Sequence, residues 1–172
     1  LGALLMAREA GLQIIGDYGL NIINSPAARQ AAELGCGAIT LSFECERGAA
    51  KNIASPVPLG VIAYGHLPLM LLRNCPGKTA AGCGDCTGIN RITDRRGEDF
   101  PLQCERRRYT HLLNPRPLLL CDRLPEWDFC DFLTLRFTVE SPAECDEVLK
   151  MYRTGAAPAG QFTRGLYYRT LK

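Results

Sequence analysis

The sequence predicts an α/β fold: a partial (β/α) barrel of about four βα units that carries a small, Cys-rich antiparallel insert. Helix-like and short apolar segments alternate up to residue 64, the alternation stops over 65–113, and it resumes over 114–155. Strands separated by helical crossovers usually pair in parallel. The predicted parts are barrel-type βα units at 1–64, the Cys-rich insert at 65–113, a further βα unit at 114–155, and a linker and tail at 156–172.

The first part contains three helix signals and three strand signals in alternation. Gly11 follows a helical run and is a typical stop, while Ser25 is a good N-cap and Pro26 a good first helical residue. Gly35 closes that second helix. The expected helices are 2–10, 26–34 and 44–53, and the expected strands are 12–16, 38–43 and 57–64.

The later parts mix strand and helix signals. Strand-like residues at 91–94 and 100–113 flank Arg96-Gly97, which predicts an antiparallel hairpin. Asn114 is expected to cap a helix that runs to about residue 124. Residues 132–139 alternate as a strand, and the capping box Ser141-Pro142-Ala143-Glu144 opens a helix that ends near Gly155.

The number of βα units falls short of a closed barrel, which needs about eight of them. The chain also lacks an initiator Met and opens directly on a helical run. We therefore expect a piece of a longer protein, with the remainder of the parent chain completing the barrel; a small open sheet is the alternative.

Composition excludes some classes of protein. No run of about 18 apolar residues is present, so no transmembrane helix is expected and we predict no membrane partner. The net charge of +2 is too small to indicate nucleic-acid binding by itself. The βα rhythm favours a cytoplasmic protein, where clustered cysteines more often bind metal than form disulfides.

Four of the nine cysteines lie in the irregular Gly-rich segment, with the spacing Cys75-x7-Cys83-x2-Cys86-x17-Cys104. The x2 pair lets two sulfurs reach one ion from a tight turn, and four thiolates complete either a zinc site or a four-iron cluster. Free thiols and disulfides are the alternatives. We predict a metal or iron–sulfur centre, and the ligands alone lean towards zinc.

Polar residues at the ends of the expected strands are the catalytic candidates of a barrel. The main candidates are Asp17, Glu44, His66 and Arg136, and Asn21 and Tyr64 are also at strand ends. Each main candidate has a simpler interpretation: Asp17 as a turn former, Glu44 as a helix start, His66 as a buried histidine and Arg136 as a solvent-facing residue.

The basic run Arg106-Arg107-Arg108-Tyr109 predicts either contact with RNA phosphates or a solvated hairpin edge. Arg164, Tyr167, Tyr168 and Arg169 in the tail allow the same two interpretations. RNA is therefore a candidate partner.

Several motifs in order resemble the C-terminal part of the collagenase-like peptidase U-32 family. They are Gly-Asp-Tyr-Gly-Leu-Asn at 16–21, Thr-Leu-Ser at 40–42, Tyr-Gly-His-Leu-Pro-Leu-Met at 64–70, Asn-Cys-Pro at 74–76, Ile-Thr-Asp-Arg at 92–95, Phe-Pro-Leu at 100–102, Leu-Leu-Asn at 112–114 and Phe-Thr-Arg-Gly-Leu-Tyr at 162–167. The resemblance implies a (β/α) barrel and a cysteine-bound 4Fe–4S cluster. It also implies kinship with oxygen-independent hydroxylases of tRNA, rRNA or quinone precursors, some of which use prephenate.

The chain departs from the family pattern at Pro68, where the family commonly has a cysteine. Cys75 and Cys86 match family cysteines, whereas Cys83 and Cys104 resemble a branch-specific pair. Zinc therefore stays open as the alternative to the iron–sulfur cluster. Three functions follow: part of an iron–sulfur hydroxylase or RNA-modifying enzyme, a non-catalytic metal-stabilised module, or a peptidase as the family name states.

Overall fold

A computed structural model describes residues 2–78, 82–83, 86–158 and 160–169. Leu1 and residues 170–172, at the ends of the first and last predicted parts, lie outside the described residues. The chain forms two compact units: Leu1–Ala63 with Leu120–Leu135 and Arg164–Lys172, and Tyr64–Leu119 with Arg136–Thr163. No helix in the described ranges has the length and apolar character needed to cross a membrane.

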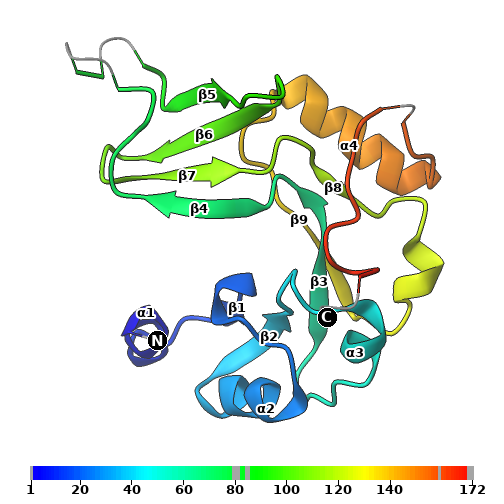
Figure 1. Ribbon diagram of the computed structural model, residues 1–172. Helices are drawn as coiled ribbons and strands as arrows, with labels where there is room; N and C mark the ends of the chain where they lie inside the picture. Colours follow the sequence, from blue (N-terminus) through cyan, green and yellow to red (C-terminus); the bar gives the residue numbers. More distant parts are fainter. Residues whose placement is uncertain (1, 79–81, 84–85, 159, 170–172) are drawn as a thin grey trace. The chain divides into compact units, whose positions relative to one another are not determined.

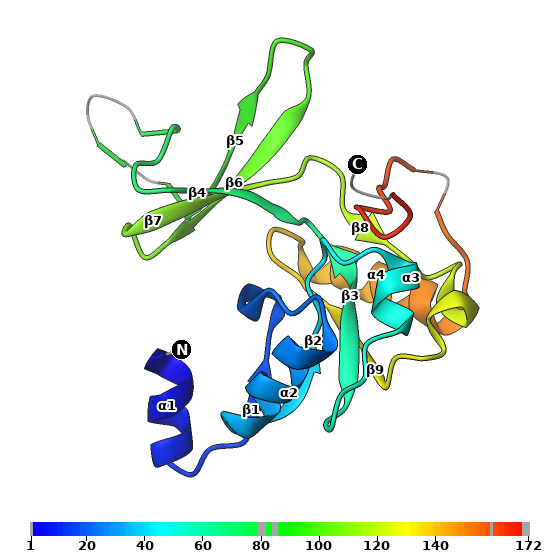
Figure 2. The same cartoon turned by 60° about the horizontal axis from the view of Figure 1, so that its bottom comes forward.

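The first unit begins with alternating helices and parallel strands (Figure 1). Strand β1 pairs with β2, and β2 pairs with β3, both in parallel. Helix α2 begins one residue earlier than predicted, because the Asn24 side chain accepts from the Ala27 N–H at 2.9 Å while the Ser25 hydroxyl accepts from Ala54. The elements are α1 (Gly2–Glu9), β1 (Ile14–Gly16), η1 (Tyr18–Leu20), α2 (Ser25–Glu33), β2 (Cys36–Thr40), α3 (Arg47–Lys51) and β3 (Leu59–Gly65). Helix α1 lies beside β1 and α2 beside β2 (Figure 2).

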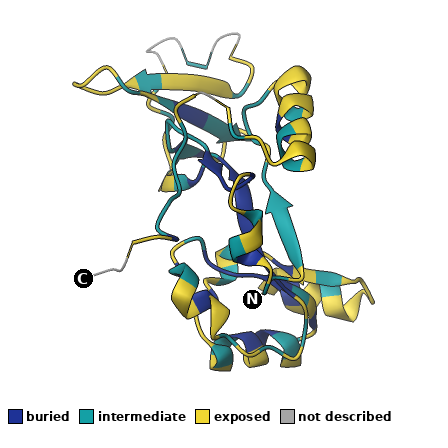
Figure 3. Ribbon diagram, turned by 90° about the vertical axis from the view of Figure 1, so that its right-hand side faces the viewer, coloured by how far each residue is buried: buried dark blue, intermediate teal, exposed yellow. Residues whose placement is uncertain are grey.

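Strand β3 is buried along its whole length. All seven of its residues are buried, as the dark blue ribbon in Figure 3 shows. The core of the first unit continues through Trp127 and Tyr167, whose rings meet edge to face with centroids 4.7 Å apart. The Tyr167 hydroxyl donates to the Ile62 carbonyl at 2.9 Å, which fixes the C-terminal segment on β3.

The second unit contains an antiparallel sheet in the order β4-β7-β6-β5. The predicted hairpin around Arg96-Gly97 is present, and its turn is stabilised by Asp94, whose carboxylate accepts from the Arg96 and Glu98 N–H groups. The segment 100–113 is divided into two strands where Arg106 and Arg107 adopt positive φ angles. The strands are β4 (Pro68–Leu72), β5 (Ile89–Thr93), β6 (Asp99–Glu105) and β7 (Tyr109–Leu113).

The predicted partial (β/α) barrel is wrong. The described strands form one mixed and one antiparallel sheet, and no barrel of βα units is closed from them. After β3 the next strand in the same sheet, β8 (Leu118–Leu119), pairs with Tyr64 and Gly65 in the antiparallel sense. Strand β9 (Phe132–Leu135) also pairs with β3. The rhythm of parallel strands therefore ends after three strands.

The helix predicted over 114–124 is also absent, and β8 and the short η2 (Leu124–Trp127) take its place. Pro115 and Pro117 remove backbone donors, and each disfavours helical geometry in the residue before it. Leu118, Leu119 and Leu120 are at most 2% exposed, so this apolar run is fully buried, and its first two residues form β8.

Helix α4 (Pro142–Thr154) follows the predicted capping signals. The Ser141 hydroxyl accepts from the Glu144 N–H at 3.4 Å, and the Glu144 carboxylate accepts from the Ser141 N–H at 2.7 Å. Gly155 ends the helix with φ 69°, as its position predicts.

Candidate functional site

The four clustered cysteines gather at one end of the antiparallel sheet. Cys75 follows β4, Cys83 and Cys86 lie in the connection from β4 to β5, and Cys104 is in β6. A cavity of about 340 Å³ is lined by Cys75, Cys83 and Cys104, and a second of about 250 Å³ is lined by Cys83, Cys86 and Cys104. The two cavities share two thiols, so all four sulfurs border one region.

Four cysteine thiols are suitable ligands for a zinc ion or an iron–sulfur cluster. Their sulfur atoms, however, do not converge on one point in this structure. All nine cysteines are free thiols. Within the described ranges, no three Cys, His, Asp or Glu side chains converge closely enough to hold a metal ion. The backbone nevertheless links the cysteine segments, since Cys104 N–H donates to the Gly88 carbonyl at 2.7 Å and Gly88 N–H to the Cys86 sulfur at 3.4 Å.

Basic side chains border the same cavities. Arg73, Lys78 and Arg107 line the larger one, and Arg106 and Arg107 the smaller one. Four thiolates around a zinc ion or a four-iron core carry a net charge of about −2, so nearby cations favour the assembled centre. The electrostatics of the region therefore suit a thiolate cluster.

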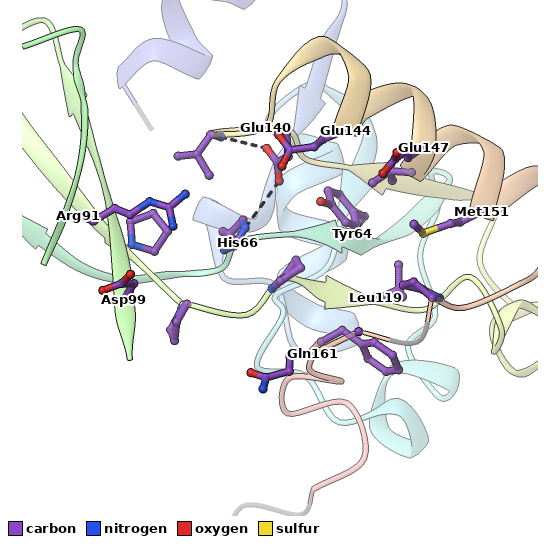
Figure 4. A pocket seen from close by; sticks show the side chains of 18 residues that line it. Tyr64, His66, Arg91, Asp99, Leu119, Glu140, Glu144, Glu147, Met151 and Gln161 are labelled. Carbon is purple, nitrogen blue, oxygen red and sulfur yellow. Dashed lines mark hydrogen bonds and ion pairs between the residues drawn. The ribbon is translucent and has the colours of Figure 1, made fainter. Parts of the chain in front are cut away.

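A separate pocket of about 330 Å³ lies in the second unit (Figure 4). Its walls come from the end of β3, from β5 and β6, from α4 and from the segment after α4. Figure 4 shows the side chains of Glu140, His66 and Tyr64 directed towards one another at one side. The lining includes Tyr64, His66, Arg91, Asp99, Leu119, Glu140, Glu144, Glu147, Val148, Met151 and Phe162.

Glu140 is the buried charge of this pocket, with its side chain only 5% exposed. One carboxylate oxygen, Oε2, accepts from the N–H groups of Thr138 and Val139 at 2.6 and 3.0 Å. The other, Oε1, is buried and accepts no hydrogen bond, and His66 Nε2 lies 4.0 Å from it. A buried acceptor without a donor costs free energy, so this oxygen marks a place where a donor is expected to bind.

His66 and Tyr64 complete the polar side of the pocket. The His66 Nδ1 atom lies 2.6 Å from the Asn114 carbonyl oxygen. A carbonyl can only accept, so Nδ1 carries the proton, and in the neutral ring Nε2 is an acceptor. Burial, followed by the charge of Glu140, raises the pKa of Tyr64, so its hydroxyl stays protonated at neutral pH.

The predicted catalytic residues fall in different places. Asp17 is exposed and caps η1 by accepting from the Tyr18 N–H at 2.7 Å. Glu44 is exposed and lines a cavity of about 220 Å³ in the first unit. In the second unit, the Arg136 guanidinium donates to the His66 carbonyl at 3.4 Å. Only His66 of these four lines the polar pocket.

The residue that sequence reasoning missed is Glu140. In the sequence, Glu140 is an acidic residue between the strand predicted at 132–139 and the helix cap at Ser141. That position suggests a loop, and nothing local reveals that Tyr64 and His66 enclose it.

Comparisons with protein-family models, with curated proteins and with solved structures found no match for this chain. The resemblance to the U-32 family therefore rests on the sequence motifs and stays a prediction.

Proposed function

We propose that this chain is the cysteine-bearing part of a cytoplasmic, oxygen-independent hydroxylase or RNA-modifying enzyme of the U-32 type. Cys75, Cys83, Cys86 and Cys104 would hold a 4Fe–4S cluster, with zinc as the alternative. The supporting observation is that these four free thiols border two adjoining cavities with Cys83 and Cys104 in common. When bound, such a cluster supplies one-electron chemistry.

The chain's own residues have distinct roles in this proposal. Cys104 is held in the β6–β7 ladder opposite Thr110, so it offers a fixed sulfur. Cys75, Cys83 and Cys86 would supply the other three sulfurs from positions between β4 and β5. Arg73, Lys78 and Arg107 would balance the negative charge of the thiolates.

RNA is the substrate class that the surroundings favour. Arg106, Arg107, Arg108 and Tyr109 are exposed on the β6–β7 turn, and two of these arginines line the smaller cysteine cavity. Cations beside an aromatic ring suit a phosphate backbone with unstacked bases. The remainder of the parent chain would supply the other substrate contacts.

A non-catalytic, metal-stabilised module is the second candidate. The cysteines connect an irregular segment to the regular strand β6, so a bound metal would supply folding free energy to that segment whether or not chemistry follows. The peptidase alternative has less support, because His66 faces the Asn114 carbonyl and Glu140 rather than a hydroxyl or thiol nucleophile.

The test is to purify the chain without oxygen and to measure iron, sulfide and zinc. An iron–sulfur centre predicts brown protein with about four irons per chain and a broad sulfur-to-iron absorbance. Cys86→Ser should lose most of the metal. Cys145→Ser, on helix α4 of the same unit, is the matched control and should retain it.

The outcomes separate the candidates. Stoichiometric zinc in colourless protein would favour the module. Full metal content in Cys86→Ser would remove the proposed ligand set. If Cys86→Ser in the full-length parent enzyme abolished turnover while circular dichroism stayed native, the centre would be catalytic rather than structural.

A further inference from the structure

The polar side of the pocket presents three hydrogen-bond acceptors to a common point. Glu140 Oε1 has no hydrogen-bond partner, and His66 Nε2, which is an acceptor in the neutral ring, lies 4.0 Å away. The Tyr64 hydroxyl faces the same carboxylate, to which it donates, and its oxygen lone pairs can still accept from a bound group (Figure 4). A separation of 4.0 Å is too long for a direct hydrogen bond but leaves both atoms able to share a donor group.

The residues that line the pocket carry a net negative charge. Glu140, Glu144, Glu147 and Asp99 are carboxylates, and Arg91 is the permanent cation among the lining residues. Hydrogen bonds from the Ser141 backbone and hydroxyl lower the pKa of Glu144, which keeps it ionised. Four carboxylates outnumber Arg91 even if His66 is counted as a second cation, so the lining is formally anionic and attracts cations.

The remaining wall is apolar. Leu119, Val148, Met151 and Phe162 line it, and the volume of about 330 Å³ is at the lower end of small-molecule pockets. A bare metal ion fits this lining poorly, because the second oxygen of Glu140 is already engaged by two backbone N–H groups. Hard divalent cations require six or more oxygen ligands.

We infer that this pocket binds a small organic cation in which a primary ammonium group is carried on an apolar or aromatic body. The ammonium has three donors for the three acceptors Glu140 Oε1, His66 Nε2 and Tyr64 Oη. Its body packs against Met151 and Phe162. This site is independent of the cysteine centre and of the function proposed for it.

The experiment compares three probes that share a phenylethyl body: 2-phenylethylammonium, the neutral 2-phenylethanol and the anionic 3-phenylpropionate. Binding is measured by calorimetry on the full chain. The methyl groups of its three methionines are followed by NMR. The ammonium should bind at least about tenfold more tightly than either analogue, because only it satisfies and neutralises Glu140. The Met151 methyl signal should move, while those of Met6 and Met70 stay in place.

Three variants test which residues bind the ammonium group. Glu140→Gln keeps an oxygen for the two backbone donors and should weaken ammonium binding at least about tenfold. Tyr64→Phe keeps the ring in contact with Phe137 and should weaken ammonium binding by about threefold or more. Asp146→Asn removes an exposed charge on helix α4 that does not line the pocket and serves as the matched control, with less than about a threefold change.

Equal affinity for the three probes, or tighter binding of the anion, would overturn the inference. The same holds if Glu140→Gln binds the ammonium as well as the native chain does. If Glu140→Gln fails to fold, the probe series on the native chain together with Tyr64→Phe decides the matter. These readouts do not involve metal, so their failure leaves the cysteine proposal intact.

Discussion

Replacing Tyr167 by Phe tests whether the C-terminal segment is an integral part of the first unit. The Tyr167 side chain is 1% exposed, and its hydroxyl donates to the Ile62 carbonyl at 2.9 Å. Phe keeps the ring, and therefore the edge-to-face contact with Trp127, while it removes the donor. The substitution isolates one buried hydrogen bond that joins residues far apart in the sequence.

The expected cost combines two effects. The net contribution of a buried hydrogen bond is about 1 kcal/mol, and a buried acceptor left without a donor adds about 1 kcal/mol or more. We therefore expect the free energy of unfolding to fall by about 2 kcal/mol. With a urea m-value of about 2 kcal/mol/M, the midpoint should move down by about 1 M. Fluorescence of Trp127, the single tryptophan, reports on this unit directly because its ring touches Tyr167.

The neighbouring tyrosine supplies the control. Tyr168 is 40% exposed and its hydroxyl donates to Glu126 at 2.9 Å, so Tyr168→Phe removes the same atom from an exposed hydrogen bond. Its cost should stay below about 0.5 kcal/mol. If the two variants unfold at the same urea concentration, Tyr167 does not fasten the C-terminal segment to β3 and the reasoning fails.

Two further predictions concern backbone geometry and pH. Gly65→Ala should destabilise the chain by about 2 kcal/mol or more, because Gly65 has φ 137° and an added Cβ would clash with the Arg136 carbonyl oxygen. Gly97→Ala, at φ 80° in open surroundings, should cost only about 1 kcal/mol in thermal denaturation, and equal costs would exclude the clash. Asp122 accepts two hydrogen bonds of 2.7 Å from Arg164, which lower its pKa. The pKa of Asp122 in the folded protein lies below its unfolded value of about 3.9. The stabilisation by the Asp122–Arg164 ion pair is therefore fully present above about pH 3.9 and is lost as the pH falls through the folded pKa of Asp122. Asp122→Asn should therefore destabilise the protein at pH 7 and much less at pH 2.5 in urea titrations, and an equal loss at both would contradict the ion pair.

Elements specified by adjacent residues could be predicted from the sequence. The capping box of α4 and its terminal Gly155 depend on contacts within four residues, and both have the expected geometry. The hairpin around Arg96-Gly97 was predictable for the same reason, since Asp94 supplies the turn bonds locally. The three parallel strands were recognised as short apolar runs between helical segments.

Whether a strand joins a sheet in the parallel or the antiparallel sense depends on tertiary packing rather than on adjacent residues. The barrel prediction was wrong because β8 joins β3 in the antiparallel sense. The helix predicted over 114–124 rested on Asn114 as its cap, although Pro115 and Pro117 disfavour helical geometry in the residues before them. That Leu118 and Leu119 pair antiparallel with Gly65 and Tyr64 follows from tertiary packing. The same limit applies to the pocket, because Glu140 lines it together with Tyr64 and His66, which are far from Glu140 in the sequence.

Strand β6 links the two candidate sites, and its pairing indicates that each can form without the other. Asp99 and Pro101 line the pocket, whereas Cys104 lines the cysteine cavities about 10 Å further along the strand. The β5–β6 register is fixed by pairs from Ile89–Gln103 to Thr93–Asp99 and by the turn at Asp94, none of which needs a metal. The bond from Arg116 to Glu98, at 2.7 Å, fastens the same end of the hairpin. The wall that β5 and β6 contribute to the pocket is therefore expected to form in metal-free protein.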